Sequence, residues 1–190
     1  QLKKFKKGIN VVDEVINENS EYSIASSSLI LDRSKGKNIV ALAAILQSSP
    51  LVLLSLKNLN LNATTNLKER TIMGGPSINS AEFRLMLLNK GLRKKDLKIV
   101  GNSGSIDELI NKEIDFLLGY ISNQPYILED LNIKYNINYP EFKGIHFYND
   151  ILFTSKEEVS KHPRRVNNFI KASLKGWKYA FNNIDETIEL

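Results

Sequence analysis

The stretch RTIMGGPSINSAEFRLMLLNKG, residues 70–91, contains one strand, one turn and one helix. Arg70 to Met73 is a predicted strand, and Gly74-Gly75-Pro76-Ser77 is a typical turn. Residues 79–90 repeat apolar side chains at helical spacing, and Gly91 follows as a helix stop. The stretch therefore predicts a complete β-α unit.

The same alternation extends in both directions along the chain. We expect further strands at 22–25, 39–45, 51–56, 97–100, 115–120, 134–139 and 147–154, and further helices at 9–16, 29–33, 106–112, 123–131 and from Pro163 onward. Strands that alternate with helices in this way indicate an α/β fold with mixed, mostly parallel sheets. The run at 39–45 is continuously apolar, which predicts a strand covered on both faces.

The tail after Pro163 carries an amphipathic stripe. Its apolar members recur at helical spacing and are Val166, Phe169, Ile170, Leu174, Trp177 and Phe181. Such a stripe normally faces a core, so we expect Trp177 to be packed rather than to stack on a ligand.

The composition is that of an ordinary globular protein. Of the 190 residues, 42% are hydrophobic, and 26 Lys and Arg against 21 Asp and Glu give a net charge of +5. This excludes disordered and collagen-like chains. The cations are mostly interspersed with acids, so nothing indicates nucleic acid as a partner. The longest apolar runs, 39–46 and 51–54, are far shorter than the roughly 20 residues that cross a bilayer.

Several kinds of chemistry are excluded by what the chain lacks. It has no cysteine, which excludes disulfides, thiolate metal sites and thiol nucleophiles. Its two histidines, His146 and His162, lie in different elements, and we expect them to be surface residues or hydrogen-bonded partners rather than ligands. No phosphate-binding or nucleophile motif occurs. The sequence therefore indicates binding rather than catalysis, with no cofactor and no metal.

Polar loops follow several of the expected strands. They are Ser26-Ser27-Ser28, Gln47-Ser48-Ser49, Gly74-Gly75-Pro76-Ser77, Asn102-Ser103-Gly104-Ser105 and Tyr120-Ile121-Ser122-Asn123-Gln124. Ligands of open α/β sheets bind at such strand ends, where backbone N–H groups and helix N-termini converge. These loops carry few charges, which suits a neutral or weakly anionic polar ligand. An alternative stays open, in which the Ser and Asn residues only cap helices and the glycines only form turns.

The residues that we expect to line a ligand site lie at these strand ends, except Tyr148, which we expect near a hinge. They are Ser27, Ser28, Gln47, Ser48, Ser49, Gly74, Gly75, Tyr120, Asn123 and Tyr148. The amides of Gln47 and Asn123 offer both a donor and an acceptor, and the Tyr120 phenol can stack on a planar ring. A helix that starts near Asn79 is expected to favour partial negative charge on the ligand.

Three segments resemble one known family. They are residues 26–54 (SSSLILDRSKGKNIVALAAILQSSPLVLL), 115–128 (DFLLGYISNQPYIL) and 144–188, which contains the Gly-Trp-x-Tyr-Ala piece at 176–180. They are similar to the thiamine-pyrimidine-precursor binding family, among the periplasmic substrate-binding proteins of nitrate, sulfonate and taurine importers. The third segment is most similar to versions that form the extracytoplasmic sensors of histidine kinases and diguanylate cyclases.

The resemblance implies a two-lobed type II periplasmic-binding-protein fold with two chain crossings and a ligand in the cleft. Lobe 1 would comprise 1–56 and 147–190, and lobe 2 would comprise 57–146. Two departures from the family are evident. Family members begin with a further N-terminal segment, so lobe 1 is expected to be incomplete, and their usual Asn-Glu-Pro is Asn123-Gln124-Pro125 here.

For function, the resemblance implies an extracytoplasmic sensor domain that binds a planar polar solute such as a thiamine-pyrimidine precursor and belongs to a signal-transduction protein. The alternative is the substrate-binding protein of an ABC importer, whose partner would be a permease. A fungal pyrimidine-synthesis enzyme of this superfamily carries a cysteine-rich motif that is absent here. We expect a periplasmic or extracytoplasmic location, with membrane tethering through regions outside these 190 residues as a further expectation.

Overall fold

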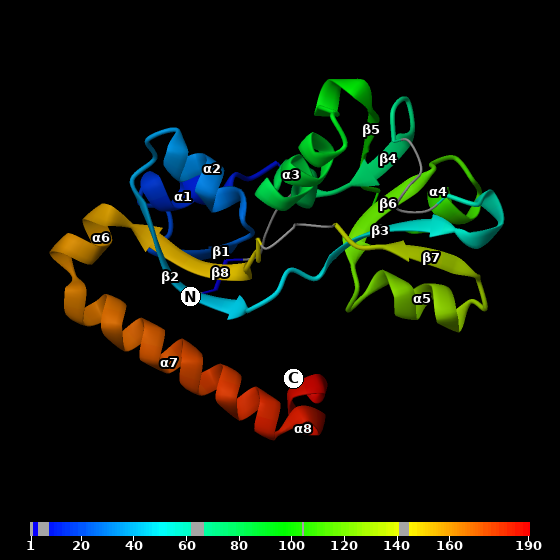
Figure 1. Ribbon diagram of the computed structural model, residues 1–190. Coiled ribbons are helices and arrows are strands. Elements are labelled where there is room, and N and C mark those ends of the chain that lie inside the picture. The colour runs from blue at the N-terminus through cyan, green and yellow to red at the C-terminus, as the bar shows by residue number, and fades with distance from the viewer. Residues whose placement is uncertain (1, 4–7, 62–66, 104, 141–144) are drawn as a thin grey trace. The chain divides into compact units, whose positions relative to one another are not determined.

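The computed structural model describes residues 2–3, 8–61, 67–103, 105–140 and 145–190 (Figure 1). The chain divides into two compact units. Unit 1 comprises Gln1–Ala25, Asp32–Ile45 and Asp150–Leu190, and unit 2 comprises Ser26–Leu31 and Leu46–Asn149. Helix α2 (Ser28–Ser34) and strand β2 (Ile39–Leu46) each cross a boundary between these segments.

Unit 2 is built on a five-stranded sheet of order β5-β4-β6-β3-β7. Its strands are β3 (Leu51–Leu56), β4 (Thr71–Gly74), β5 (Lys98–Gly101), β6 (Phe116–Tyr120) and β7 (Tyr135–Asn138). Its helices are α3 (Ala81–Asn89), α4 (Asp107–Ile110) and α5 (Gln124–Asp130), with 3-10 turns at Lys57–Leu59, Pro76–Asn79 and Lys94–Asp96. Strand β4 runs parallel to β5 and β6, whereas β3 runs antiparallel to β6 and β7. The expected mixed α/β fold is confirmed.

The sheet of unit 2 is covered on both faces. Every residue of β3 is buried, and side chains alternate between the faces of a strand. Leu51 and Leu53 join a core with Phe83 and Met86 of α3, whereas Val52, Leu54 and Leu56 join a second core. That second core contains Leu109 of α4 and Leu128 of α5. The burial of every β3 residue, apolar except for Ser55, thus matches a strand with protein on both sides.

Unit 1 contains a three-stranded sheet of order β1-β8-β2. Strand β1 (Tyr22–Ala25) pairs antiparallel with β8 (Asn149–Ser155), with Tyr22 opposite Thr154. Its helices are α1 (Val11–Ile16), α6 (Lys156–Lys161), α7 (Pro163–Asn182) and α8 (Ile184–Glu189). The side chain of Asn10 caps α1, that of Ser155 caps α6, and Pro163 stands in the first turn of α7.

Two expectations about burial are wrong. Strand β2 has only Ile39 buried, because it is an edge strand of the small sheet rather than a strand covered on both faces. On α7 only Val166 is buried, whereas Trp177 is 40% exposed and Phe181 is 67% exposed. Within the part of the chain that the structure describes, the second half of the α7 stripe faces solvent.

The compact units also differ from the expected lobes. The expected boundary after residue 56 assigns Leu51–Leu56 to the first lobe, but β3 pairs with β6 and β7 inside unit 2. Its hydrogen bonds and the two cores hold β3 in unit 2. The change from unit 1 to unit 2 before β3 therefore falls between Ile45 and Leu46. The last change of unit falls at Asn149 and Asp150, close to residue 147, where the second segment of lobe 1 was expected to begin.

Replacing Phe83 by Ala tests the first core of unit 2. The ring is 0% exposed, so its removal leaves a cavity and is expected to cost about 3–5 kcal/mol of unfolding free energy. Leu88→Ala on the same helix is the control, because Leu88 is 60% exposed and its loss should cost about 0.5 kcal/mol or less. Urea unfolding measures both. Equal losses for the two variants would contradict the assigned core.

Candidate functional site

The polar loops of unit 2 gather at one edge of its sheet. Strands β4, β5 and β6 are parallel neighbours, so Gly74, Gly101 and Tyr120 end at the same edge. Strand β3 runs the other way, with Leu51 opposite Tyr120, so the loop that precedes β3 lies at this edge as well. A backbone hydrogen bond from Ile121 N to Pro50 O, 2.8 Å long, ties these two loops together. We call this the strand-end edge.

A buried carboxylate connects two of the predicted loops. Glu82, in the first turn of α3, is 0% exposed. The Ser27 hydroxyl donates to its Oε2 at 2.6 Å, and the Ser49 hydroxyl donates to its Oε1 at 2.7 Å. Sequence reasoning missed Glu82. The available signal was its spacing, since Glu82 stands four residues before Met86 on the apolar face of α3.

The first turn of α3 is already occupied by hydroxyl groups. The Ala81 N–H donates to Ser27 Oγ at 3.1 Å, and the Phe83 N–H donates to Ser80 Oγ at 3.2 Å. The expected helix start near Asn79 is corrected to Ala81, with Ser80 as its N-cap. Because these donors have partners and a carboxylate lies beside them, this helix end is poorly suited to an anion.

The two glycines after β4 leave room for neighbouring side chains. A Cβ on Gly74 would lie 3.0 Å from Ile78 Cδ1 and 3.2 Å from Leu118 Cβ. A Cβ on Gly75 would lie 3.3 Å from the Asn102 amide nitrogen. Packing of the turn therefore accounts for Gly74, while Gly75 brings the loop after β5 close to the loop after β4.

Tyr120 stands at the centre of the strand-end edge. Its backbone N–H donates to Gln124 Oε1 at 2.8 Å, and its hydroxyl accepts a 3.3 Å hydrogen bond from the buried Asn149 amide. The Gln124 side chain lies over Gly119, where an added Cβ would approach Oε1 to 2.6 Å. The amide that replaces the family's usual carboxylate therefore holds the turn after β6.

The other predicted site residues differ in exposure. Asn123, Gln47, Ser48 and Tyr148 are exposed, and the Asn123 side chain makes no capping hydrogen bond to α5. Ser28 is half-buried and accepts a 3.2 Å hydrogen bond from the Ser26 hydroxyl. All ten predicted residues belong to unit 2. Their contact with a ligand stays a prediction.

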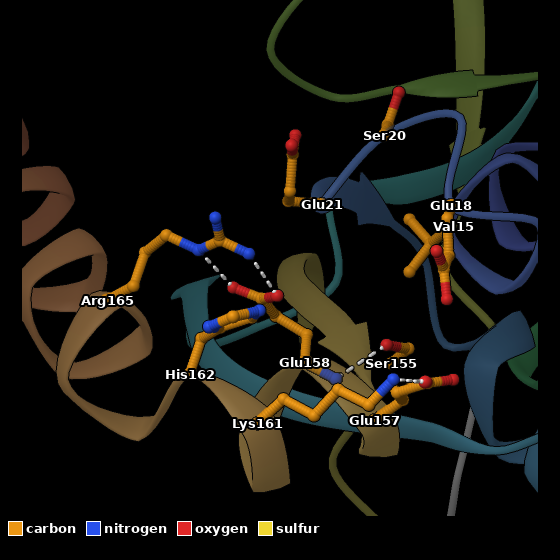
Figure 2. A pocket seen from close by; sticks show the side chains of 10 residues that line it. All are labelled: Val15, Glu18, Ser20, Glu21, Ser155, Glu157, Glu158, Lys161, His162 and Arg165. Carbon is orange, nitrogen blue, oxygen red and sulfur yellow. Dashed lines mark hydrogen bonds and ion pairs between the residues drawn. The ribbon is translucent and has the colours of Figure 1, made fainter.

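Unit 1 has a small polar pocket of about 190 Å³ (Figure 2). Its lining combines acidic and basic side chains and consists of Val15, Glu18, Ser20, Glu21, Ser155, Glu157, Glu158, Lys161, His162 and Arg165. Small-molecule pockets usually measure about 300–1,000 Å³ and are largely apolar. By size and lining this pocket is a weaker candidate than the strand-end edge. Among the described residues, no three His, Asp or Glu side chains form a group that could hold a metal ion.

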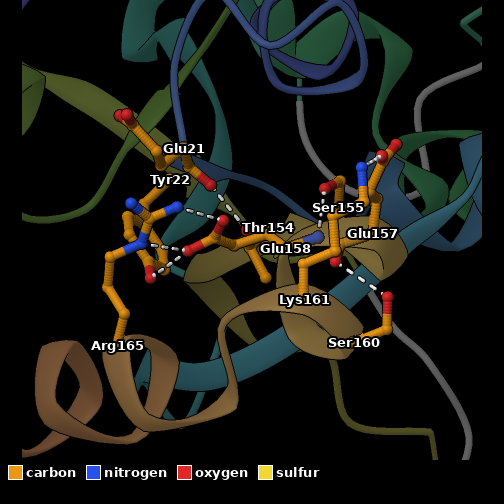
Figure 3. A network of polar contacts seen from close by, with 9 residues as sticks. All are labelled: Glu21, Tyr22, Thr154, Ser155, Glu157, Glu158, Ser160, Lys161 and Arg165. Atoms are coloured by element: carbon orange, nitrogen blue, oxygen red, sulfur yellow. Dashed lines mark hydrogen bonds and ion pairs between the residues drawn. The ribbon is translucent and has the colours of Figure 1, made fainter.

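An ion pair beside this pocket connects α6, α7 and β1 (Figure 3). Arg165 donates from Nε and Nη2 to the two carboxylate oxygens of Glu158 at 2.7 and 2.5 Å, and the Tyr22 hydroxyl donates to Glu158 Oε1 at 2.8 Å. The Tyr22 ring stacks on Phe169 at a centroid distance of 3.9 Å. The Arg165 guanidinium holds the pKa of Glu158 below its usual range. Burial and then the Glu158 hydrogen bond raise the pKa of Tyr22 to about 12.

Comparison with family models identifies the relatives of this chain. The model described as NMT1/THI5 like matches residues 1–187. The chain belongs to this family. The resemblance to thiamine-pyrimidine-precursor binding proteins is therefore confirmed at the family level, and comparison with curated proteins finds no match.

Solved structures show the fold of this NMT1/THI5-like chain in other proteins. A protein from Bordetella bronchiseptica RB50 matches with a TM-score of 0.73 and 15% identity, over 94% of this chain and 61% of its own. The periplasmic aliphatic sulphonate binding protein SsuA from Escherichia coli matches with a TM-score of 0.70 and 10% identity, over 94% and 62%. A histidine-bound substrate binding protein of an ABC uptake transporter from Streptococcus pneumoniae gives 0.61 and 15%, over 90% and 68%.

These matches confirm the expected type II periplasmic-binding-protein fold. The chain spans about three fifths of the length of the first two neighbours. None of the helices in the described segments is long and apolar enough to cross a membrane.

Replacing Gly119 by Ala tests the turn after β6. The new Cβ would displace the Gln124 amide and break its hydrogen bond to the Tyr120 N–H, so the Tyr120 amide should exchange with solvent faster. Gly101→Ala is the control, because an added Cβ there meets nothing within 4 Å. Hydrogen exchange followed by NMR distinguishes the two. Unchanged protection of Tyr120 in the Gly119 variant would show that Gln124 does not hold the turn.

Replacing Glu158 by Gln tests the ion pair through its pH dependence. A lowered pKa in the folded state means that the carboxylate stabilises the fold above its unfolded pKa of about 4.3. That contribution is lost as the pH falls through the lower folded pKa. Wild type should therefore be more stable than the variant at pH 7, and the difference should shrink below about pH 4.

Glu157→Gln is the control for this measurement, since Glu157 is exposed and pairs with Lys161 one turn along α6. An exposed pair contributes little, so this variant should follow the wild-type curve closely. Chemical unfolding between pH 3 and pH 7 gives the three curves. A gap between wild type and the Glu158 variant that is constant with pH would refute the assigned role.

Proposed function

We propose that this chain is the solute-binding part of an ABC importer and holds a small polar molecule at the strand-end edge of unit 2. The observation that carries the proposal is the gathering of four loops, with their hydroxyl, amide and backbone groups, at one edge of a rigid sheet. Ligands of open α/β sheets bind at such edges. Residues far apart in the sequence are already connected there, as Ser27, Ser49 and Glu82 show.

The related structures support binding over catalysis. The Escherichia coli neighbour is named as an aliphatic sulphonate binding protein, and the Streptococcus neighbour as the substrate binding protein of an uptake transporter. The chain also lacks the cysteine-rich motif of the fungal pyrimidine-synthesis enzyme. We therefore place the protein outside the cytoplasm, with a membrane permease as its partner. A thiamine-pyrimidine precursor remains one proposed solute among pyrimidines, sulfonates and amino acids.

A ligand panel tests the proposal. Pyrimidines, alkanesulfonates and amino acids are screened by thermal shift, and hits are measured by titration calorimetry. A solute present at 100 times its Kd should raise stability by about 2.7 kcal/mol. Chemical turnover of a bound compound by the pure protein would contradict the binding role, and an absence of binding across the panel would remove the support for this site.

Asn123→Ala tests the place of binding. Asn123 is exposed and makes no capping hydrogen bond, so the variant should keep its melting temperature without ligand. Loss of one ligand hydrogen bond should weaken binding by about 0.5–1.5 kcal/mol. The matched control is Asn167→Ala, an exposed asparagine on α7 in unit 1, which should bind as wild type does. Equal affinities for both variants would move the site away from this edge.

Transport measurements and the sequence of the complete protein distinguish a sensor from an importer component. An importer component predicts that deleting the gene abolishes uptake of the identified solute. A sensor predicts normal uptake with altered signalling, and an apolar run of about 20 residues leading to a signalling domain in the complete protein. The importer is preferred because substrate binding proteins of this kind are among the structural neighbours.

A further inference from the structure

The buried Glu82 controls which hydrogen-bonding groups Ser27 and Ser49 present. A serine hydroxyl has one proton to donate and two lone pairs that accept. Ser27 Oγ accepts from Ala81 N–H at 3.1 Å, and Ser49 Oγ accepts from Leu51 N–H at 3.2 Å. Both hydroxyl protons point to Glu82, at 2.6 and 2.7 Å. Each serine therefore keeps one lone pair and has no proton left to offer.

The accessibility of the two serines shows which of them could meet a ligand. Ser27 is 1% exposed, so its hydroxyl serves to fix Glu82 and the start of α3. Ser49 is half-buried and belongs to the loop at the strand-end edge. The acceptor that this cluster presents outward is thus the remaining lone pair of Ser49.

The negative charge of Glu82 also favours a hydrogen-bond donor on the ligand. Both of its oxygens accept from serine hydroxyls, and no lysine or arginine of the described residues forms an ion pair with it. A carboxylate that is 0% exposed acts through a medium of low dielectric constant, where its field is weakly screened. Two of the first N–H groups of α3, those of Ala81 and Phe83, donate to the hydroxyls of Ser27 and Ser80 instead of an anion.

We propose that Glu82 is a positioning residue that makes the Ser27–Ser49 side of the site an acceptor, so that the protein selects a solute with an amino group there and disfavours a sulfonate or carboxylate. This inference rests on the proposed binding function and narrows its ligand class. Of the expected neutral or weakly anionic ligand it keeps the neutral case, and it replaces the expectation that the helix start near Asn79 favours partial negative charge.

Two pairs of probes with a shared ring or alkyl chain test the selection: 4-aminopyrimidine against pyrimidin-4-one, and butylamine against butanesulfonate. Affinities are measured by NMR titration at pH 7 on wild type. The amino member of each pair should bind about tenfold tighter or more, as expected for a hydrogen bond in the field of a charged group. A wild type that binds the probes without this preference, or with the opposite one, overturns the inference while leaving the binding function intact.

Glu82→Gln tests whether the preference for the amino probes depends on this residue. The variant removes the charge, and its amide N–H donates to one serine, which frees that hydroxyl's proton for a ligand. The ratio of affinities within each pair should fall toward one. Glu129→Gln is the control, because it makes the same charge change at an exposed position of α5 in unit 2 and should keep the wild-type ratio. Identical ratios in the two variants would refute the role of Glu82.

Folding of each variant is checked by circular dichroism and thermal unfolding before titration. If Glu82→Gln does not fold, Ser49→Ala takes its place, since it deletes the outward acceptor and leaves the Ser27 hydrogen bond to Glu82. This variant should lose most of the preference for the amino probes, and retention of the preference would count against the proposal. If no probe and no member of the wider panel binds wild type, the proposed function itself fails and the inference fails with it.

Discussion

The reversed direction of β3 is the constraint on which the arrangement of unit 2 depends. An all-parallel sheet would bring only the loops that follow its strands to one edge. Because β3 lies antiparallel between β6 and β7, the loop that precedes it reaches the same edge as the loops that follow β4, β5 and β6. Ser49 thereby meets Glu82. Every residue of β3 is buried, so its register is strongly specified and fixes the loops beside it.

Two buried carboxylates illustrate two ways of satisfying a charge. Glu158 in unit 1 has a guanidinium partner that forms two hydrogen bonds, and the result is a clasp between α6 and α7. Glu82 in unit 2 has only hydroxyl partners, so its charge is solvated without being neutralised. The first arrangement is typical of structural ion pairs. The second leaves a negative potential at the edge where the loops meet.

The loops at the strand-end edge could be predicted from the sequence, because strand ends followed by Ser, Asn and Gly are visible as local patterns. Gln47, Ser48 and Asn123 were predicted in this way, and Tyr148 from its place near a hinge. All four are exposed within unit 2, and their contact with a ligand stays a prediction. Glu82 could not be identified from a local pattern in this way, because a Glu that follows a helix cap usually faces water. Its importance comes from partners 55 and 33 residues earlier in the chain.

By itself, the sequence determined the alternation of strands and helices, the α/β class, the family and the absence of thiol chemistry. These depend on residue types and on spacings of a few positions. Tertiary structure alone decided that β3 belongs to unit 2, that the second half of the α7 stripe is exposed in the described residues, and that Gln124 holds a turn. Burial and hydrogen-bond partners are properties of pairs of segments distant in sequence, and no local pattern specifies which segments will meet.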